Sequence, residues 1–243
     1  MTIMQAFQQV AAPAITCPLC GNSGFEEVNG RPNAGCRSCL SLERTRLLFL
    51  VLMKMNIFRP GMKVMHIAPE HGLRYALHNL YKEDYHACDF SIERFGNELS
   101  PIYPIDLCND IERFPSNTFD VIIHNHVLEH LPAKLDNVLA QLQRILKADG
   151  YHFFTIPMIE GYTIEDIHEA NPAVRAQRFG QDDHYRVFGM EDTIGSIRKW
   201  TGAQVTVINV SDYLTEQEVI EAGIPIDQAF AEIGPSIPFL IRK

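Results

Sequence analysis

The chain is 243 residues long, 46% hydrophobic and 21% charged, with a net charge of −9 and a single Trp. A chain of this length can bury one sizeable core and a small appendage, so we expect one main domain. The acidic balance and the lack of a long basic run argue against a chain built as a whole to hold a nucleic-acid backbone.

The N-terminal sequence has neither the basic start nor the sustained apolar core of a signal peptide. The longest apolar stretch, from Leu47 to Met53, is too short to span a bilayer. We therefore expect a cytoplasmic protein without a membrane partner.

Four cysteines follow an expected loose lead-in over residues 1–16. They are Cys17, Cys20, Cys36 and Cys39. Their spacing is C-x2-C, fifteen residues, C-x2-C, which lets two knuckles point four thiolates at one tetrahedral Zn²⁺. This spacing predicts a zinc ribbon over residues 17–40. Four protein ligands leave no open coordination position, so the zinc is expected to be structural and the compartment reducing.

A linking segment over residues 41–60 follows the cysteines. From Ser41 to Phe58 the pattern is helical, and its charges lie only in the first turns and near the end. Arg59-Pro60-Gly61 ends it. Because so broad an apolar surface must be buried, we expect this helix to join the ribbon to the main domain and to pack against the edge of a sheet.

The stretch from Met62 to Gly72 predicts a strand, a turn and the start of a helix. Val64 to Ile67 is an apolar run of strand length, and a turn over 68–72 stops it. The following residues have helical spacing up to Leu80. In an α/β sheet such a unit places a ligand over the turn, at the carboxyl end of the strand.

The next strand is predicted over Tyr85 to Cys88 and ends at Asp89, 17 residues after Gly72. An acid at this point can accept hydrogen bonds from the two hydroxyls of a ribose. The alternative is a solvated loop aspartate.

The rest of the chain alternates strands with helices, which predicts a parallel sheet covered on both faces. The expected strands are 103–107, 121–123, 151–156, 204–210 and 237–241, and the expected helices are 133–146 and 190–201. Residues 158–190 are polar and poorly periodic, and a stretch of this kind is usually functional, so we expect a substrate or lid region there. Residues 211–235 look like a helical insertion to which we assign no role.

Together these pieces resemble the class I S-adenosylmethionine-dependent methyltransferases over roughly residues 60–243. The matching segments are Phe119 to Ile122, Val127 to Leu131, and Arg144 to Gly150. A narrower resemblance is to bacterial methyltransferases that pair a four-cysteine knuckle with an H-I-A-P-E turn, here His66 to Glu70, and an F-G-Q-x-D-H-x-R segment, here Phe179 to Arg186. The resemblance implies a Rossmann-like, mostly parallel seven-stranded sheet over 61–243, with S-adenosylmethionine as cofactor.

The resemblance also implies which residues hold the cofactor. Asp89 would contact the ribose, Asp106 with Leu107 the adenine, and His124 to His126 the methionine and sulfonium end. The family's glycine-rich turn is replaced here by a turn that keeps only Gly72, and in it Glu70 can meet the ammonium or sulfonium. The expected cofactor-binding residues are His66, Ala68, Glu70, Gly72, Asp89, Asp106, Leu107, His124 and Asn125.

Methyl transfer to oxygen or nitrogen benefits from a general base with a pKa near neutrality, which suits histidine. The first candidate is His184, which Asp183 would orient, and the second is His126. We therefore expect O- or N-methylation of a small-molecule or saccharide acceptor, without a nucleic-acid partner.

Three other interpretations stay open. His126 to His130 reads H-x-x-E-H, a metalloprotease signature, although Pro132 leaves little room for the helix it needs. The ribbon could instead bind RNA through its arginines, because residues 1–60 contain six basic and only three acidic residues. The candidate phosphate contacts are Arg31, Arg37, Arg44 and Arg46. The third interpretation is a non-catalytic scaffold with a decayed cofactor turn.

Overall fold

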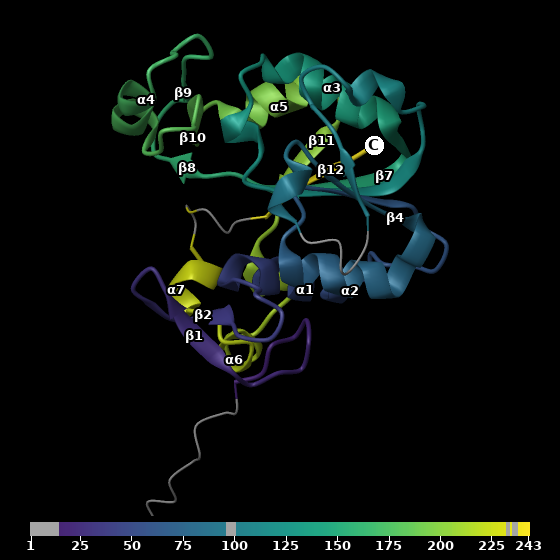
Figure 1. Cartoon of the computed structure of the whole chain (residues 1–243), viewed down its shortest axis with the longest axis vertical. Helices are drawn as coiled ribbons and strands as arrows, with labels where there is room; N and C mark the ends of the chain where they lie inside the picture. The colour runs from purple at the N-terminus through teal and green to yellow at the C-terminus, as the bar shows by residue number, and fades with distance from the viewer. Residues whose placement is uncertain (1–14, 96–100, 232–233, 235–237) are drawn as a thin grey trace, which may run out of the picture.

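The computed structural model describes residues 15–95, 101–231, 234 and 238–243. The predicted lead-in over 1–16 therefore lies almost wholly outside the described residues. A seven-stranded sheet in the order β11-β12-β7-β6-β3-β4-β5 forms the centre of the molecule (Figure 1). Its strands are β3 (Val64–Ile67), β4 (Tyr85–Asp89), β5 (Ile102–Pro104), β6 (Phe119–Asn125), β7 (Leu146–Thr155), β11 (Gln204–Val207) and β12 (Pro238–Arg242).

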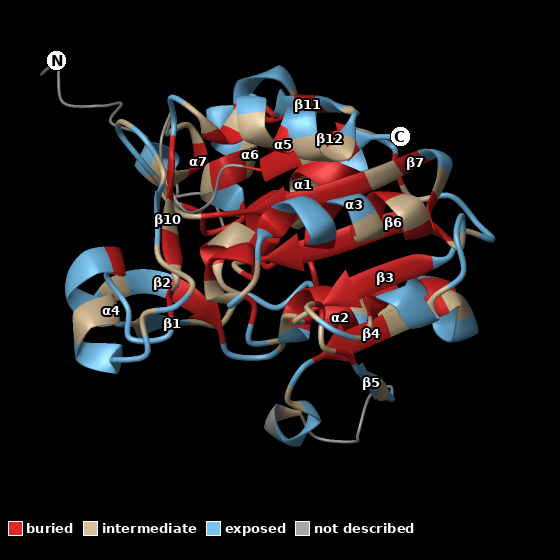
Figure 2. Ribbon diagram, turned by 90° about the horizontal axis from the view of Figure 1, so that it is seen from above, coloured by how far each residue is buried: buried red, intermediate tan, exposed pale blue. Residues whose placement is uncertain are grey.

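Five neighbouring strands, from β5 to β7, run parallel, whereas β12 pairs antiparallel with both β7 and β11. The predicted Rossmann-like, mostly parallel seven-stranded sheet is therefore confirmed. The parallel strands are nearly continuous apolar runs because helices cover both of their faces. Figure 2 shows the buried residues concentrated along β3 and β6.

Helices α1 (Glu43–Lys54) and α2 (His71–Tyr81) cover one face of the sheet, and α3 (Leu135–Ile145) and α5 (Thr193–Thr201) cover the other (Figure 1). The alternation of side chains along each strand supplies both cores. On β6, Val121 and Ile123 pack with α1 and α2, whereas Ile122 packs with α3. Short 3-10 turns lie at Lys82–Asp84, Ile92–Arg94, Ile111–Arg113, Leu128–His130 and Val210–Asp212.

The linking helix does not pack against the sheet edge, as expected from the sequence, but beside α2 on the sheet face. Leu47, Leu48 and Val51 of α1 are buried in the same core as Val64 of the central strand β3. A stripe of large aliphatic side chains needs a broad apolar partner, and the centre of a sheet offers more such area than its edge.

The residues after the predicted helix over 133–146 do not form a turn that separates it from the next strand. Helix α3 ends at Ile145 and β7 begins at the next residue, where Leu146 pairs with Phe119 of β6. Pairing resumes between Tyr151 and Val121, so four residues of β7 face one residue of β6. The strand bulges here, and Asp149 has a positive φ of 61°.

The lid region (residues 158–190) has more regular structure than its composition suggests. It holds a three-stranded sheet of β8 (Met158–Ile159), β10 (Arg186–Gly189) and β9 (Ile164–Glu165), with helix α4 (Pro172–Phe179). Two of these strands have only two residues, which is too short for a period of two to be recognised in the sequence.

A buried arginine holds the lid region to the main sheet. The guanidinium of Arg186 is fully buried and donates hydrogen bonds to the carbonyls of Leu128, Leu131 (2.9 Å) and Ala133 (2.7 Å) in the loop after β6. It also donates to Glu165 of β9 at 2.6 Å. Because a buried guanidinium without acceptors is very costly, this set fixes β10 to that loop.

The ribbon contains the antiparallel strands β1 (Phe25–Val28) and β2 (Arg31–Cys36), and the insertion contributes α6 (Glu216–Glu221) and α7 (Ile226–Ala229) beside them (Figure 1). Arg46 of α1 joins the two. Its guanidinium is fully buried and donates to the carbonyls of Asn33, Ala34 and Ser41 on the ribbon side. It also donates to Ala222 at 2.8 Å and Gly223 at 2.7 Å in the insertion.

Three histidines lie inside the sheet. His66 of β3, His124 of β6 and His152 of β7 are fully buried. The Nδ1 of His66 is 2.8 Å from the Tyr85 hydroxyl, and the Nε2 atoms of His124 and His152 are 2.9 Å apart. Burial lowers the pKa of His66 and of His152 to about 3 and that of His124 well below its usual value.

Among the described residues, no helix is long and apolar enough to cross a membrane.

The buried histidines predict a loss of stability in mild acid. Each histidine binds a proton near pH 6.5 when unfolded but resists it when folded, so the stabilisation is complete above pH 6.5 and is lost as the pH falls toward 3. Between pH 7.5 and 5, His152 alone should remove roughly 2 kcal/mol from the free energy of unfolding. Urea unfolding of His152→Gln should show a smaller drop over this range than wild type, by about that amount. In the control variant His168→Gln, which changes an exposed histidine, the free energy of unfolding should drop as much as in wild type. Equal drops in all three proteins would contradict the assignment.

Arg46 predicts a second stability effect. Lys keeps the charge but cannot reach five carbonyls with one ammonium, so Arg46→Lys should lower the free energy of unfolding by roughly 3–5 kcal/mol. Denaturant unfolding would measure this loss. Arg59→Lys, at an exposed site, is the matched control and should change stability by less than about 0.5 kcal/mol.

Candidate active site

A pocket of about 1010 Å³ opens at the carboxyl ends of the parallel strands β3, β4 and β6. This is the edge at which open α/β sheets bind their ligands. Its volume is at the upper end of the range of about 300–1,000 Å³ for small-molecule sites, so it can hold a nucleoside together with a small second molecule.

Six of the nine expected cofactor-binding residues line this pocket. They are Ala68, Glu70, Asp89, Asp106, Leu107 and Asn125. The sequence places them far apart, and the parallel register brings them together because each follows the end of a neighbouring strand or loop. Whether they bind a cofactor stays a prediction.

The other three, His66, Gly72 and His124, do not line the pocket. The two histidines are fully buried, and each lies one residue before the end of its strand. At Gly72 an added Cβ would lie 2.7 Å from the Ser41 Cβ and 3.2 Å from the Cys39 Sγ. This glycine therefore permits close contact between the start of α2 and the ribbon.

The turn after β3 is held by polar contacts. Ala68 has a positive φ of 49°, a conformation that favours glycine, and its N–H donates to the Cys88 carbonyl at 2.8 Å. The Glu70 carboxylate accepts from Arg44 Nε at 2.9 Å and from Asn125 Nδ2 at 2.8 Å. Thr155 in turn donates to Asn125 Oδ1 at 3.0 Å.

Two of the aspartates that line the pocket, Asp89 and Asp106, differ in their hydrogen bonds. Asp89 is buried at the end of β4, where its Oδ1 accepts the N–H of Ser91 at 2.7 Å. Asp106 accepts the Cys108 N–H and the Asn109 amide, both at 2.8 Å, and so closes its own turn. Asp106 is therefore also a local structural residue.

Of the three expected catalytic residues, two line the pocket and one does not. His126 and Asp183 line the pocket, whereas His184 is buried beside it and does not. His126 Nδ1 lies 3.0 Å from Glu129 Oε1, and Asp183 Oδ2 lies 3.2 Å from His130 Nδ1. Asp183 therefore contacts His130 and is placed to orient that residue. Burial lowers the pKa of His184, with neighbouring His130 adding to the shift.

Sequence reasoning missed several pocket residues. Phe90 follows Asp89 directly and is 79% exposed, which gives the pocket an aromatic face at the end of β4. Its position next to a strand-terminal acid was the available signal. Arg44, Arg175 and Tyr185 come from distant elements, and no local pattern marks them.

The H-x-x-E-H segment does not form the helix that a metalloprotease motif requires. His126 lies at the end of β6 with a φ of 52°, and Leu128–His130 is a single 3-10 turn. His126 and His130 are therefore not one helical turn apart on a common face.

The ribbon arginines are engaged within the protein. Arg46 is fully buried, so its expected role as a phosphate contact is wrong. Arg31 pairs with Glu43 at 3.1 Å and Arg44 with Glu70 at 2.9 Å. Arg37 is more exposed and lies 3.9 Å from Glu26.

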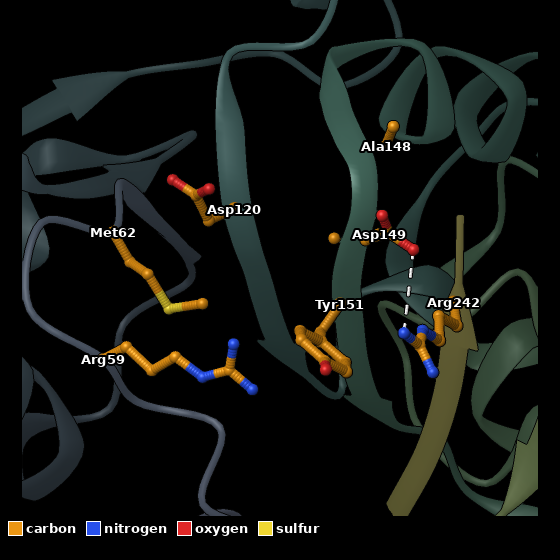
Figure 3. Close-up of a pocket in the computed structure, with 8 residues that line it drawn as sticks. Arg59, Met62, Asp120, Ala148, Asp149, Tyr151 and Arg242 are labelled. Carbon is orange, nitrogen blue, oxygen red and sulfur yellow. Dashed lines mark ion pairs between the residues drawn. The ribbon is translucent and has the colours of Figure 1, made fainter.

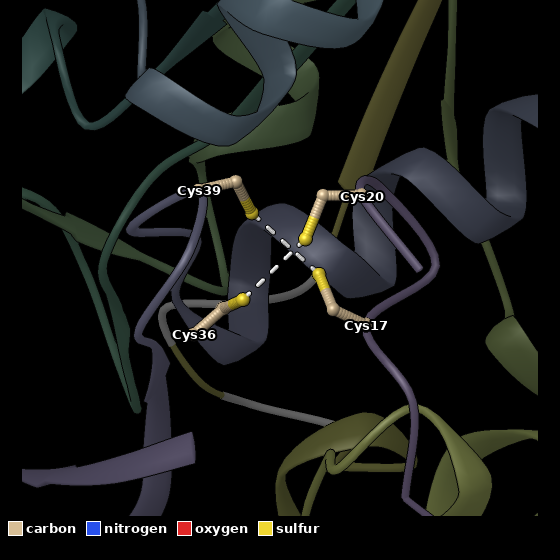
Figure 4. A group of neighbouring side chains, drawn as sticks. All are labelled: Cys17, Cys20, Cys36 and Cys39. Atoms are coloured by element: carbon tan, nitrogen blue, oxygen red, sulfur yellow. Dashed lines mark hydrogen bonds between the residues drawn. The ribbon is translucent and has the colours of Figure 1, made fainter. Parts of the chain in front are cut away.

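The four ribbon cysteines converge on one point (Figure 4). The Sγ atoms of Cys17 and Cys39 are 3.6 Å apart, as are those of Cys20 and Cys36. Four thiolates about 2.3 Å from a tetrahedral Zn²⁺ would have sulfur–sulfur distances of about this size. Among the described residues, all six cysteines are free of disulfides.

A second pocket of about 400 Å³ lies at the opposite end of the sheet (Figure 3). Asp120 and Tyr151 border it near the β7 bulge, and Asp149 pairs with Arg242 at 3.6 Å. It lies at the amino ends of β3 and β6, where open α/β sheets do not place their ligand sites. We therefore assign function to the larger pocket.

Comparison with known proteins connects this site to a chemistry. A family model described as a methyltransferase domain matches residues 70–154. No curated protein matches the chain.

Solved structures share the fold. The 1,6-didemethyltoxoflavin-N1-methyltransferase of Burkholderia thailandensis is 15% identical, with a TM-score of 0.50 over 83% of this chain and 78% of that chain. A SAM dependent methyltransferase from Archaeoglobus fulgidus is 14% identical, with a TM-score of 0.49 over 84% and 95% of the two chains. Residues 70–154 therefore match a methyltransferase domain, and the chain carries them on a Rossmann-like sheet.

Proposed function

We propose that this chain is an S-adenosylmethionine-dependent methyltransferase and that it methylates an oxygen or nitrogen atom of a small-molecule or saccharide acceptor. The observation that carries the proposal is the pocket of about 1010 Å³ at the carboxyl ends of β3, β4 and β6. Its walls are strand ends and the lid region. A pocket bounded in this way suits a compact acceptor beside the cofactor.

The pocket residues offer a site for each part of S-adenosylmethionine. Asp89 would accept hydrogen bonds from the ribose hydroxyls, and Phe90 and Leu107 would face the adenine. Arg44 and the N-terminus of α2 would attract the carboxylate of the methionine moiety. Glu70 would meet the ammonium or sulfonium.

When bound, S-adenosylmethionine supplies a methyl carbon that is already activated by the sulfonium. The chain's task is to hold an acceptor in line with that carbon and to remove its proton. We propose His126 as the base. Glu129 holds the ring through its contact with Nδ1, and the imidazole would take the acceptor's proton as the acceptor receives the methyl group.

We further propose that the four cysteines hold a structural Zn²⁺. The spacing of the sulfurs and the absence of disulfides among the described residues support it. The same free thiols support a reducing compartment, the cytoplasm. With its ribbon and its H-I-A-P-E turn, the chain would fall within the narrower bacterial group that combines these two features.

Isothermal titration with S-adenosylhomocysteine tests the cofactor site. Wild type should bind it, and Asp89→Asn should bind roughly 10–100-fold more weakly because a charged acceptor for the ribose is lost. Asn keeps an oxygen for the Ser91 N–H, so the fold should survive, which thermal unfolding would check. Asp227→Asn, at an exposed position on α7, should bind as wild type does. Absence of binding by wild type would overturn the proposal and favour a non-catalytic scaffold.

Elemental analysis tests the ribbon zinc. The double variant Cys20→Ser/Cys39→Ser should contain one metal ion fewer per chain than wild type. It should also unfold at a lower temperature, because structural zinc contributes directly to folding. Cys108→Ser lies outside the cluster and should keep the wild-type metal content. A double variant that retains the full metal content would contradict the assignment.

A further inference from the structure

A second group of potential metal ligands lies beside the pocket, far from the cysteines in the sequence. Glu129, His130 and His184 each offer one ligand atom, and these atoms all lie within 4.8 Å of one another. Glu129 and His130 belong to the turn after β6, and His184 precedes β10. The Tyr185 N–H donates to the Glu129 carbonyl at 2.9 Å, which holds the two segments together.

Two of these side chains are buried with an unsatisfied polar atom. Glu129 is fully buried and His184 is 4% exposed. Among the described residues, nothing hydrogen-bonds Glu129 Oε2 or His184 Nδ1. An unpaired polar atom of this kind costs about 1–3 kcal/mol, and more when the group is charged. A species placed between these atoms would remove that cost.

The second polar atom of Glu129 and that of His130 are already held. Glu129 Oε1 contacts His126 Nδ1 at 3.0 Å, and His130 Nδ1 contacts Asp183 Oδ2 at 3.2 Å. Histidine ligands of metals characteristically donate their second N–H to a carboxylate or a backbone carbonyl, which fixes the ring and its tautomer.

We propose that Glu129, His130 and His184 bind a divalent transition-metal ion, separate from the zinc of the ribbon. Two imidazoles and one carboxylate suit zinc and its first-row neighbours rather than Mg²⁺ or Ca²⁺, which prefer oxygen ligands. Three protein ligands leave coordination positions open, unlike the four thiolates of the ribbon.

The site lies where the acceptor would bind. His130 lines the pocket, as do His126 and Asp183, the residues that hold Glu129 and His130 in place. Resting on the proposed function, this position indicates an acceptor that offers an oxygen ligand to the ion, such as a hydroxyl or carboxylate group. The metal would then position that acceptor.

Metal analysis of the full-length, zinc-loaded protein tests the site. Wild type should hold two ions per chain, whereas Glu129→Gln and His184→Asn should each hold one. His168→Asn, an exposed histidine of the same lid region, should hold two. Asp183→Asn should keep the ligands but weaken the second site about 10–100-fold, since it loosens His130. Circular dichroism would establish that each variant is folded.

Cobalt provides a readout that separates the two sites. With zinc in the ribbon, added Co²⁺ should give visible absorption without the thiolate charge-transfer band that cysteine ligands produce. A wild type that holds only one ion and gives no such spectrum would overturn the proposal, as would variants of Glu129 and His184 that keep the second ion. Titration of the same samples with S-adenosylhomocysteine would show separately whether the cofactor site fails, because ion binding does not require that cofactor.

Discussion

The buried guanidinium of Arg46 is the interaction on which the arrangement of the molecule depends. It lies at the start of α1, where the ribbon, the insertion and the main sheet meet. It donates hydrogen bonds to five backbone carbonyls, three on the ribbon side and two in the insertion. Burial lowers its pKa, and the nearby Cys17 and Glu43 oppose that shift. The hydrogen bonds of this one side chain therefore couple the positions of the ribbon and the insertion to the packing of α1.

From α1 the coupling continues to the cofactor turn. Arg44 lies two residues before Arg46 and binds Glu70, and the start of α2 fits against Ser41 and Cys39 through Gly72. In glycine-rich turns the backbone itself is shaped to approach the ligand. Here a turn that contains Ala68 in a left-handed conformation is held from outside, by a side chain of α1 and by the ribbon.

The sequence predicted those parts of the fold that depend on local periodicity. The strand, turn and helix over 64–81 were found because their apolar spacing is regular, and Asp89 because strand ends converge in a parallel sheet. The role of Gly72 could not be predicted, because contacts with residues 31 and 33 positions earlier leave no local pattern. The junction of α3 and β7 was also missed, since a pairing between Leu146 and Phe119 overrode the turn-forming residues that follow.

The contact at Gly72 bears on how this chain could be shortened. A chain that starts at residue 61 would keep every strand of the central sheet, because the first of these strands in the sequence begins at Val64. Such a truncation would remove the side chains that cover the start of α2 and the cation that faces Glu70. The apolar face of α2 and the carboxylate of Glu70 would then be exposed to solvent. Homologous chains without a ribbon therefore need another element at this position, or a side chain larger than glycine to fill the space.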